Sequence, residues 1–263
     1  MFGHTTCETM PEAFLTDHQA WDNYISQVWV TVLSTCAFKR DGVVVEVGPG
    51  TSSKIGGALA RLDFCGTLYV VDALQDVVNL LKPKYQALLP NATVKYIAEP
   101  IAMACDELPK NIDVLLSNHV FDDMIIAKAC EGHKQSPEAV SWAVKYSHKP
   151  VDNLKQVWLE LLGKPQVLKT CKQAVIDDFN LAIECLNPAC FILSQYPSST
   201  LYDSDLQSLN DHSVALLKKI ATKYQSSLWP KHKIQKSLDQ NKNYRNAHIG
   251  QHVLNAEYWV VSQ

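Results

Sequence analysis

The sequence predicts an α/β protein with a doubly wound, mostly parallel sheet of seven strands, in which the C-terminal pair of strands is antiparallel. Three observations lead to this fold class. Apolar strand-like runs alternate with helix-length segments, a glycine-rich turn follows the first run, and no helical pattern separates the last two runs. A chain of 263 residues with 47% hydrophobic content can bury the core of one such domain.

The first strand is expected at Val43–Val47, a β-branched run interrupted only by Glu46. The turn Gly48-Pro49-Gly50 then leads into small residues that can open a helix. Further strand-like runs begin at Leu68, Thr93, Ile112, Cys190, Ser226 and Glu257. Helical spacing of apolar residues begins at Asp76, Lys169 and Asp205. Pro83 is expected to break or kink the first of these helices, because proline removes a backbone donor.

Two segments lie outside this alternation. Residues 1–40 precede the first strand and form an N-terminal helical cover with an aromatic, amphipathic stretch. Residues 41–263 form the main domain, with a helical insertion at about 120–170 that is longer than a crossover helix needs. We expect both segments to cover the carboxyl ends of the strands, where open α/β sheets bind their ligands.

Composition limits the partners. The net charge of −3 gives no basic excess for a nucleic-acid backbone, so nucleic acid is not an expected partner. No apolar run is long enough to span a membrane, and the N-terminus lacks a signal-peptide pattern. Eight scattered cysteines indicate free thiols in a reducing compartment. We therefore expect a soluble, cytoplasmic protein, and the sequence leaves a homodimer open.

The glycine turn and a later carboxylate form the pattern of a nucleoside site. Asp72 ends the second strand-like run, 24 residues after Gly48, where a carboxylate can hold ribose hydroxyls. Ser53 replaces the third glycine of a dinucleotide fingerprint. Glu46 stands two residues before the turn, and its charge would repel a pyrophosphate but attract an ammonium or sulfonium. The pattern therefore favours a cationic ligand that carries a ribose.

The motifs "EVGPGTSS" and "VVDA" resemble those of class I, Rossmann-like S-adenosylmethionine-dependent methyltransferases. The alternation of five parallel strands with helices, followed by an antiparallel pair, is also similar to that family. The resemblance implies S-adenosylmethionine as cofactor, with Glu46 near the methionine ammonium, Asp72 on the ribose, and Ala73 and Leu74 beside the adenine. The full set of implied cofactor residues is Glu46, Gly48, Pro49, Gly50, Ser52, Asp72, Ala73, Glu99, Pro100 and Asn118.

The end of the fourth strand supplies the candidates for catalysis. The resemblance places substrate-facing residues in "SNHVFDD", where His119 could act as a general base and Asp123 is a second catalytic candidate. Helix capping is the competing explanation for Asp122 and Asp123, and structural hydrogen bonding is the competing one for His119. The expected contacts to the methyl acceptor come from His119, Phe121, Trp142 and Tyr146.

These residues predict transfer of a methyl group to a small organic acceptor by direct in-line displacement. A nicotinamide-dependent oxidoreductase and a non-catalytic cofactor-binding protein of the same fold are the alternatives. No Asn/Asp-Pro-Pro-Tyr sequence, typical of amino-group methylation on nucleobases or glutamine, occurs. His248 and His252 have helical metal-ligand spacing, but Gly250 interrupts it, so we expect no metal.

Overall fold

A computed structural model describes residues 18–34, 36, 38–132, 152–195, 204–228 and 258–261. It confirms an α/β fold with five parallel strands flanked by helices. The strands are β1 (Val43–Val47), β2 (Thr67–Val71), β3 (Thr93–Ile97), β4 (Val114–Asn118), β5 (Cys190–Gln195), β6 (Ser227–Leu228) and β7 (Tyr258–Val261). They lie in the order β3-β2-β1-β4-β5-β7-β6.

The centre of the sheet is β1, which pairs in parallel with β2 on one side and β4 on the other. From β1 to β3 the strands follow one another toward one edge of the sheet. The chain then crosses back, and β4 pairs on the other side of β1, so the topological switch point lies beside β1. β7 pairs antiparallel with β5, and the two-residue β6 pairs antiparallel with β7. Because β1 to β5 are parallel, their carboxyl ends meet at one edge, and an open α/β sheet has its ligand crevice at such a switch point.

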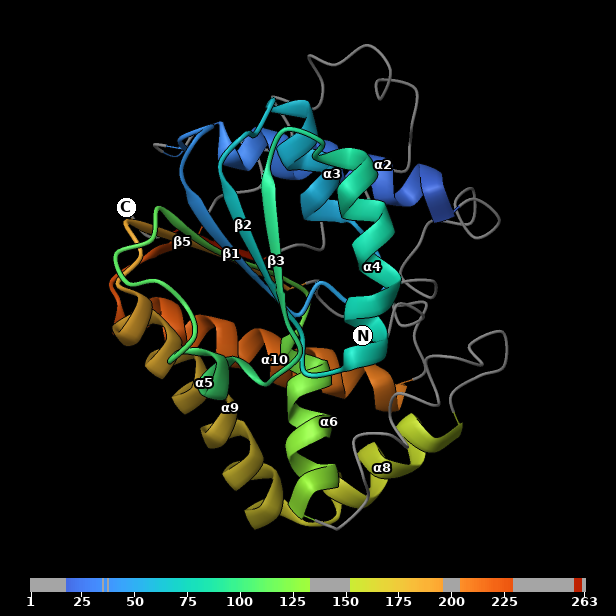
Figure 1. Cartoon of the computed structure of the whole chain (residues 1–263). Coiled ribbons are helices and arrows are strands. Elements are labelled where there is room, and N and C mark those ends of the chain that lie inside the picture. Colours follow the sequence, from blue (N-terminus) through green and yellow to red (C-terminus); the bar gives the residue numbers. More distant parts are fainter. Residues whose placement is uncertain are drawn as a thin grey trace.

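Helices cover both faces of the sheet (Figure 1). One face carries α2 (His18–Leu33), α3 (Lys54–Arg61) and α4 (Gln75–Leu88). The other face carries α5 (Ile101–Ala104), α6 (Phe121–Gly132), α8 (Asp152–Leu162), α9 (Pro165–Leu186) and α10 (Ser204–Lys223). Side chains alternate between the two faces of the sheet, so each strand contributes to both cores. In β1, Val44 packs toward α2 and α3, whereas Val45 and Val47 pack toward α6 and α9.

The N-terminal helix packs on a face of the sheet and not across its carboxyl ends. Tyr24, Val28 and Val32 of α2 are buried in the same core as α3 and the β1, β4 and β5 side chains. Two side chains of α2 reach toward the carboxyl edge: the Trp29 indole donates to Asn118 at the end of β4, and the Ser26 hydroxyl donates to the Lys54 carbonyl at the start of α3. The apolar stripe of α2 is satisfied by this packing, which explains its position.

The helix α4 continues through Pro83, so of the two expected outcomes, a break or a kink, the break does not occur. Proline removes the hydrogen bond to the carbonyl one turn earlier, at Asn79. Pro83 and Asn79 are both exposed, so water can satisfy that carbonyl. The buried face of the helix, which includes Val78, Leu81 and Tyr85, keeps the segment helical across the proline.

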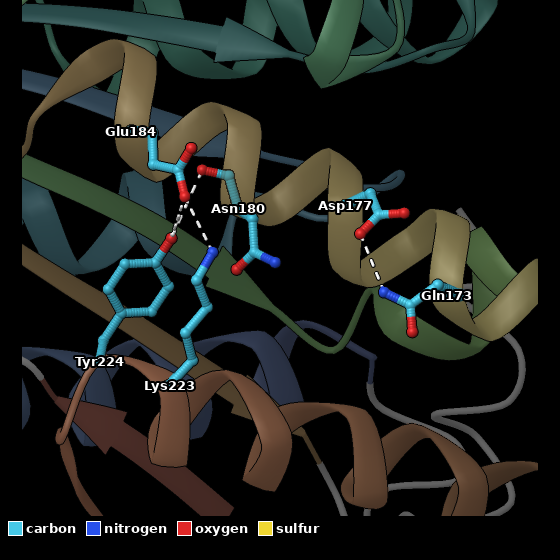
Figure 2. Close-up of polar contacts among 6 residues, drawn as sticks. All are labelled: Gln173, Asp177, Asn180, Glu184, Lys223 and Tyr224. Carbon is cyan, nitrogen blue, oxygen red and sulfur yellow. Dashed lines mark hydrogen bonds and ion pairs between the residues drawn. The ribbon is translucent and has the colours of Figure 1, made fainter.

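The last two long helices are joined by polar contacts on their outer side (Figure 2). Lys223 of α10 lies 2.8 Å from a carboxylate oxygen of Glu184 on α9, and the Tyr224 hydroxyl donates to the same oxygen at 3.4 Å. The side chains of this pair are 44% and 61% exposed, so the contact is screened by water. None of the described helices is long and apolar enough to cross a membrane.

Candidate functional site

A pocket opens at the carboxyl edge of the parallel strands, beside the switch point. It holds about 550 Å³ of empty space, part of it open to solvent. Strand ends and the loop after β3 form one wall, and α6 with one residue of α9 forms the other. The lining residues are Val47, Gly48, Val71, Asp72, Ala73, Glu99, Pro100, Ile101, Val120, Asp123, Met124, Ala127, Lys128 and Asp178.

Glycine is required where the chain leaves β1. Gly48 has φ +63° and Gly50 has φ +64°, a left-handed conformation that side chains disfavour. The N–H of Gly48 donates to the Val71 carbonyl at 2.8 Å, which ties the turn to the end of β2. A Cβ on Gly48 would lie 2.2 Å from Cγ2 of Val120. The turn therefore brings bare backbone to the pocket wall.

Asp72 lies in the pocket wall with a buried carboxylate, 2% exposed. Its Oδ1 accepts the N–H of Leu74 at 3.0 Å, a bond that fixes the rotamer. Its Oδ2 has no hydrogen-bond partner within the described part of the chain. Burial raises the pKa of Asp72, and the backbone N–H groups of Leu74 and Gly50 counteract that rise. A buried acceptor without a partner is costly, so this oxygen marks a place for a ligand donor.

Glu46 does not reach the pocket. It points to the opposite face from Val45 and Val47, because side chains alternate along β1, and it is 1% exposed. There its Oε2 accepts the hydroxyl of Tyr85, from α4, at 2.6 Å. Burial raises the pKa of Glu46 to about 8, and the Tyr85 hydrogen bond opposes that rise. The carboxyl is thus mainly neutral at pH 7 and supports the glycine turn from behind, whereas the sequence suggested a charged group near an ammonium.

We expect the Glu46→Gln variant to change how stability depends on pH. The folded-state pKa of about 8 exceeds the ordinary value of 4.5, so the stability that comes from the neutral carboxyl is complete below pH 4.5 and is lost as the pH rises toward 8. The loss reaches at most about 1.4 kcal/mol per pH unit. Because an amide does not titrate, Glu46→Gln should become progressively more stable relative to the parent as pH rises through this window. Urea unfolding from pH 5 to 8 measures this, with the exposed Glu107→Gln as control, and a constant difference between parent and variant would contradict it.

The residue that ends β4, Asn118, is held from two sides. Its Oδ1 accepts the indole N–H of Trp29 at 3.0 Å and the hydroxyl of Ser194 at 3.0 Å. Two donors on one oxygen fix the orientation of the amide. Asn118 is therefore rigid at the carboxyl edge, although it does not line the pocket.

His119 is buried, and each of its ring nitrogens lies near a polar side chain. Its Nδ1 lies 3.1 Å from Nε2 of Gln195, whose Oε1 accepts the N–H of Phe121. Its Nε2 lies 3.3 Å from Oδ2 of Asp122. With the amide turned this way, Nδ1 accepts and Nε2 carries the proton. The residue also has φ +55°, an uncommon conformation for a side chain. This geometry supports the structural explanation of His119 over the general base.

The two acidic residues at the start of α6 have different surroundings. Burial alone would raise the pKa of Asp122, but the imidazole of His119 outweighs burial and holds that pKa below its usual value. Asp123 is 3% exposed and lines the pocket. The two catalytic candidates were His119 and Asp123. Of these, Asp123 is the one that lines the pocket.

The structure brings together part of the predicted site. Six of the predicted residues line the pocket, and they are Gly48, Asp72, Ala73, Glu99, Pro100 and Asp123. Six others lie around it without lining it, and they are Glu46, Pro49, Gly50, Ser52, Asn118 and His119. Phe121, expected to contact the acceptor, is fully buried against Phe179 at a ring-centroid distance of 4.8 Å. Trp142 and Tyr146 lie outside the described residues, as do His248 and His252.

The sequence interpretation missed the α6 wall and its partner on α9. Met124, Ala127 and Lys128 follow Asp123 at one-, four- and five-residue offsets, which is one face of a helix. That spacing was a usable signal. The sequence held no comparable signal for Asp178, because this residue comes from α9 and reaches the pocket only through the packing of the helices. Its Oδ2 lies 2.9 Å from Nζ of Lys128.

Within the described residues, no group of three His, Cys, Asp or Glu side chains is placed to hold a metal ion. Among the described residues that line the pocket, four are acidic (Asp72, Glu99, Asp123 and Asp178) and one is a lysine, Lys128. Such an excess of carboxylates favours a cationic ligand. Apolar side chains of β1, β2 and α6 fill the space between these groups, as expected for a small-molecule site.

No family model matches the chain, and no curated protein matches it significantly. Solved structures share its fold. The plantazolicin methyltransferase BamL, in complex with a triazolic desmethylPZN analog and SAH, superposes with a TM-score of 0.51 at 13% identity, over 98% of this chain and 94% of that chain. BpumL, with the same kinds of ligand, gives 0.50 at 9% identity, over 94% and 86%.

A SAM-dependent methyltransferase from Aquifex aeolicus gives a TM-score of 0.45 at 13% identity, covering 88% of this chain and 86% of that chain. At these identities the comparisons bear on the fold alone. The chain therefore has the Rossmann-like fold of the class I S-adenosylmethionine-dependent methyltransferases.

Proposed function

We propose that the protein binds S-adenosylmethionine in this pocket and transfers its methyl group to a small organic acceptor. The observation that carries the proposal is the Asp72 carboxylate, whose Oδ2 is buried in the pocket wall and has no partner within the described part of the chain. A ribose offers two hydroxyl donors to such an oxygen. Gly48 lies in the same wall, where backbone can approach the methionine part.

The ligand's charge also fits the pocket. The cofactor carries a sulfonium and an ammonium against one carboxylate, so its net charge is positive. The acidic excess of the pocket complements that charge, and it does so without Glu46, which is turned away and mainly neutral. The attraction expected from Glu46 is thus supplied by Asp72, Asp123 and their neighbours.

The reaction needs little from the protein beyond alignment. A nucleophilic atom of the acceptor attacks the methyl carbon in line, the carbon–sulfur bond breaks, and sulfur keeps the electron pair as the thioether of S-adenosylhomocysteine. The acceptor's proton, where it has one, leaves to solvent or to a nearby base. Positioning can supply about 7 to 11 kcal/mol of the barrier. Asp123 faces the pocket and could take the proton, while His119 holds the loop through Asp122 and Gln195.

The part of the proposal that concerns the methyl acceptor is supported by the fold. BamL and BpumL were each crystallised with SAH and a desmethylPZN analog, so this fold can hold the cofactor product and an acceptor analogue together. In this chain the acceptor would lie beyond Asn118 and His119 at the end of β4. The expected contacts of Trp142 and Tyr146 stay part of the proposal.

Calorimetric titration with S-adenosylhomocysteine tests the proposal. We expect measurable heat and a thermal shift, because a ligand at 100 times its Kd stabilises the native state by about 2.7 kcal/mol. Reduced nicotinamide cofactor is titrated in parallel. Binding of the nicotinamide cofactor alone would favour an oxidoreductase, and no response to S-adenosylmethionine or S-adenosylhomocysteine on folded protein would refute the proposal. Binding without turnover on any acceptor would favour the non-catalytic alternative.

A further inference from the structure

A lysine and a histidine lie in direct contact outside the pocket. Lys172 of α9 and His212 of α10 are both half-buried, on the side of the sheet where α8, α9 and α10 pack together (Figure 1). Nζ of Lys172 lies 2.7 Å from Nδ1 of His212. Neither residue lines the pocket at the strand ends, so this pair is separate from the candidate site described above.

The imidazole of His212 is oriented by α8. It meets the indole of Trp158 edge-on, with the ring centroids 5.4 Å apart. That indole is fully buried, and its N–H donates to the Ser208 hydroxyl at 2.8 Å, which fixes its orientation. Burial and the charge of Lys172 lower the pKa of His212, although Asp211 opposes that change. The ring is therefore mainly neutral at pH 7, and its Nδ1 can accept a proton from the lysine.

The amine of Lys172 has the surroundings of a nucleophile. Partial burial and the nearby charge of Lys219 lower its pKa, so a larger share of the amine is unprotonated. No carboxylate within the described part of the chain forms an ion pair with it. By contrast, the hydrogen bond from Lys223 to Glu184, on the outer side of α9, raises the pKa of that lysine (Figure 2). Desolvation and a neighbouring cation are means by which proteins activate a lysine.

We propose that Lys172 is a nucleophilic amine that is acylated by thioesters, with His212 as the base. The amine nitrogen attacks the thioester carbonyl carbon, the C–N bond forms, and the C–S bond breaks with its electron pair on sulfur. Nδ1 of His212 takes the proton that the amine loses, and the leaving thiolate receives a proton from the imidazolium or from water. The products are an amide at Lys172 and a free thiol. The pair supplies a nucleophile and a base, so the donor must carry a good leaving group, as a thioester does.

The test is acetylation of the full chain by the acetyl thioester of N-acetylcysteamine at pH 7, with peptide mass spectrometry to follow each lysine. Lys169, an exposed lysine three residues earlier on α9, is the internal control. Lys172 should react about tenfold faster than Lys169, the factor that one unit of pKa gives in free amine. In concentrated urea the two rates should become equal, because unfolding removes the burial, the neighbouring charge and the base together. Equal rates in the folded protein, or a preference that persists in urea, would overturn the proposal.

Two variants separate the contributions of the neighbours. Lys219→Gln removes the nearby charge, so it should slow acetylation of Lys172 at pH 7 and have less effect at pH 10, where more of the amine is free in both proteins. His212→Phe keeps an aromatic ring beside Trp158 but removes the base, so it should slow the reaction of Lys172 at both pH values and leave Lys169 unchanged. An unchanged Lys172 rate in folded His212→Phe refutes the proposed step. If His212→Phe does not fold, the comparison of folded and unfolded parent still decides whether Lys172 is activated.

Discussion

The Asp72→Asn variant is expected to bind S-adenosylhomocysteine about 100-fold more weakly than the parent. The amide oxygen can still accept the Leu74 N–H that Oδ1 accepts now, so the loop after β2 keeps its shape. The amide nitrogen then replaces Oδ2 and presents a donor where the ribose hydroxyl must donate. Hydrogen bonds to a charged group contribute about 1.5–3 kcal/mol each, and 1.4 kcal/mol is a tenfold change in Kd.

Calorimetry on both proteins, with melting temperatures as a check on folding, measures this effect. Asp76→Asn is the matched control, because Asp76 is an exposed carboxylate four residues later, in the first turn of α4. Affinity of Asp72→Asn within threefold of the parent would show that this carboxylate does not hold the ligand.

Replacing Gly48 by alanine is expected to lower the free energy of unfolding by about 2–5 kcal/mol and to abolish cofactor binding. The left-handed φ of +63° costs a side chain about 1–2 kcal/mol. The new Cβ would also lie 2.2 Å from Val120 Cγ2, and overpacking typically adds about 1–3 kcal/mol. Because Gly48 and Val120 both line the pocket, relief of the contact must move a pocket wall.

Chemical denaturation measures the change in stability, and Gly163→Ala is its control. A Cβ at Gly163 meets only ordinary contacts, the nearest at 3.4 Å, and the residue has no left-handed φ. The double variant Gly48→Ala/Val120→Ala should recover part of the loss, because it removes the clash and keeps the backbone strain. A Gly48→Ala protein as stable as the parent would refute the proposed strain.

The sequence by itself determined the frame of the site. The run of valines in β1, the glycines after it and the aspartate after β2 each have a local physical reason, namely strand propensity, left-handed φ and a polar residue at a strand end. Parallel neighbours bring their carboxyl ends to one edge, so these local features met in one place as expected. The family resemblance indicated Ala73, Glu99 and Pro100, and these residues also line the pocket.

Only the tertiary structure decided how these groups are charged and what faces them. Burial raises the pKa of Glu46 to about 8, although the hydroxyl of Tyr85, 39 residues away in the chain, opposes that rise. The ring nitrogens of His119 face Asp122 and Gln195, the second of which lies on another strand. Asp178 reaches Lys128 only because α9 packs on α6. Local sequence sets backbone preference, but desolvation and pairing depend on neighbours that are distant in the chain, and these determine the chemistry of the pocket.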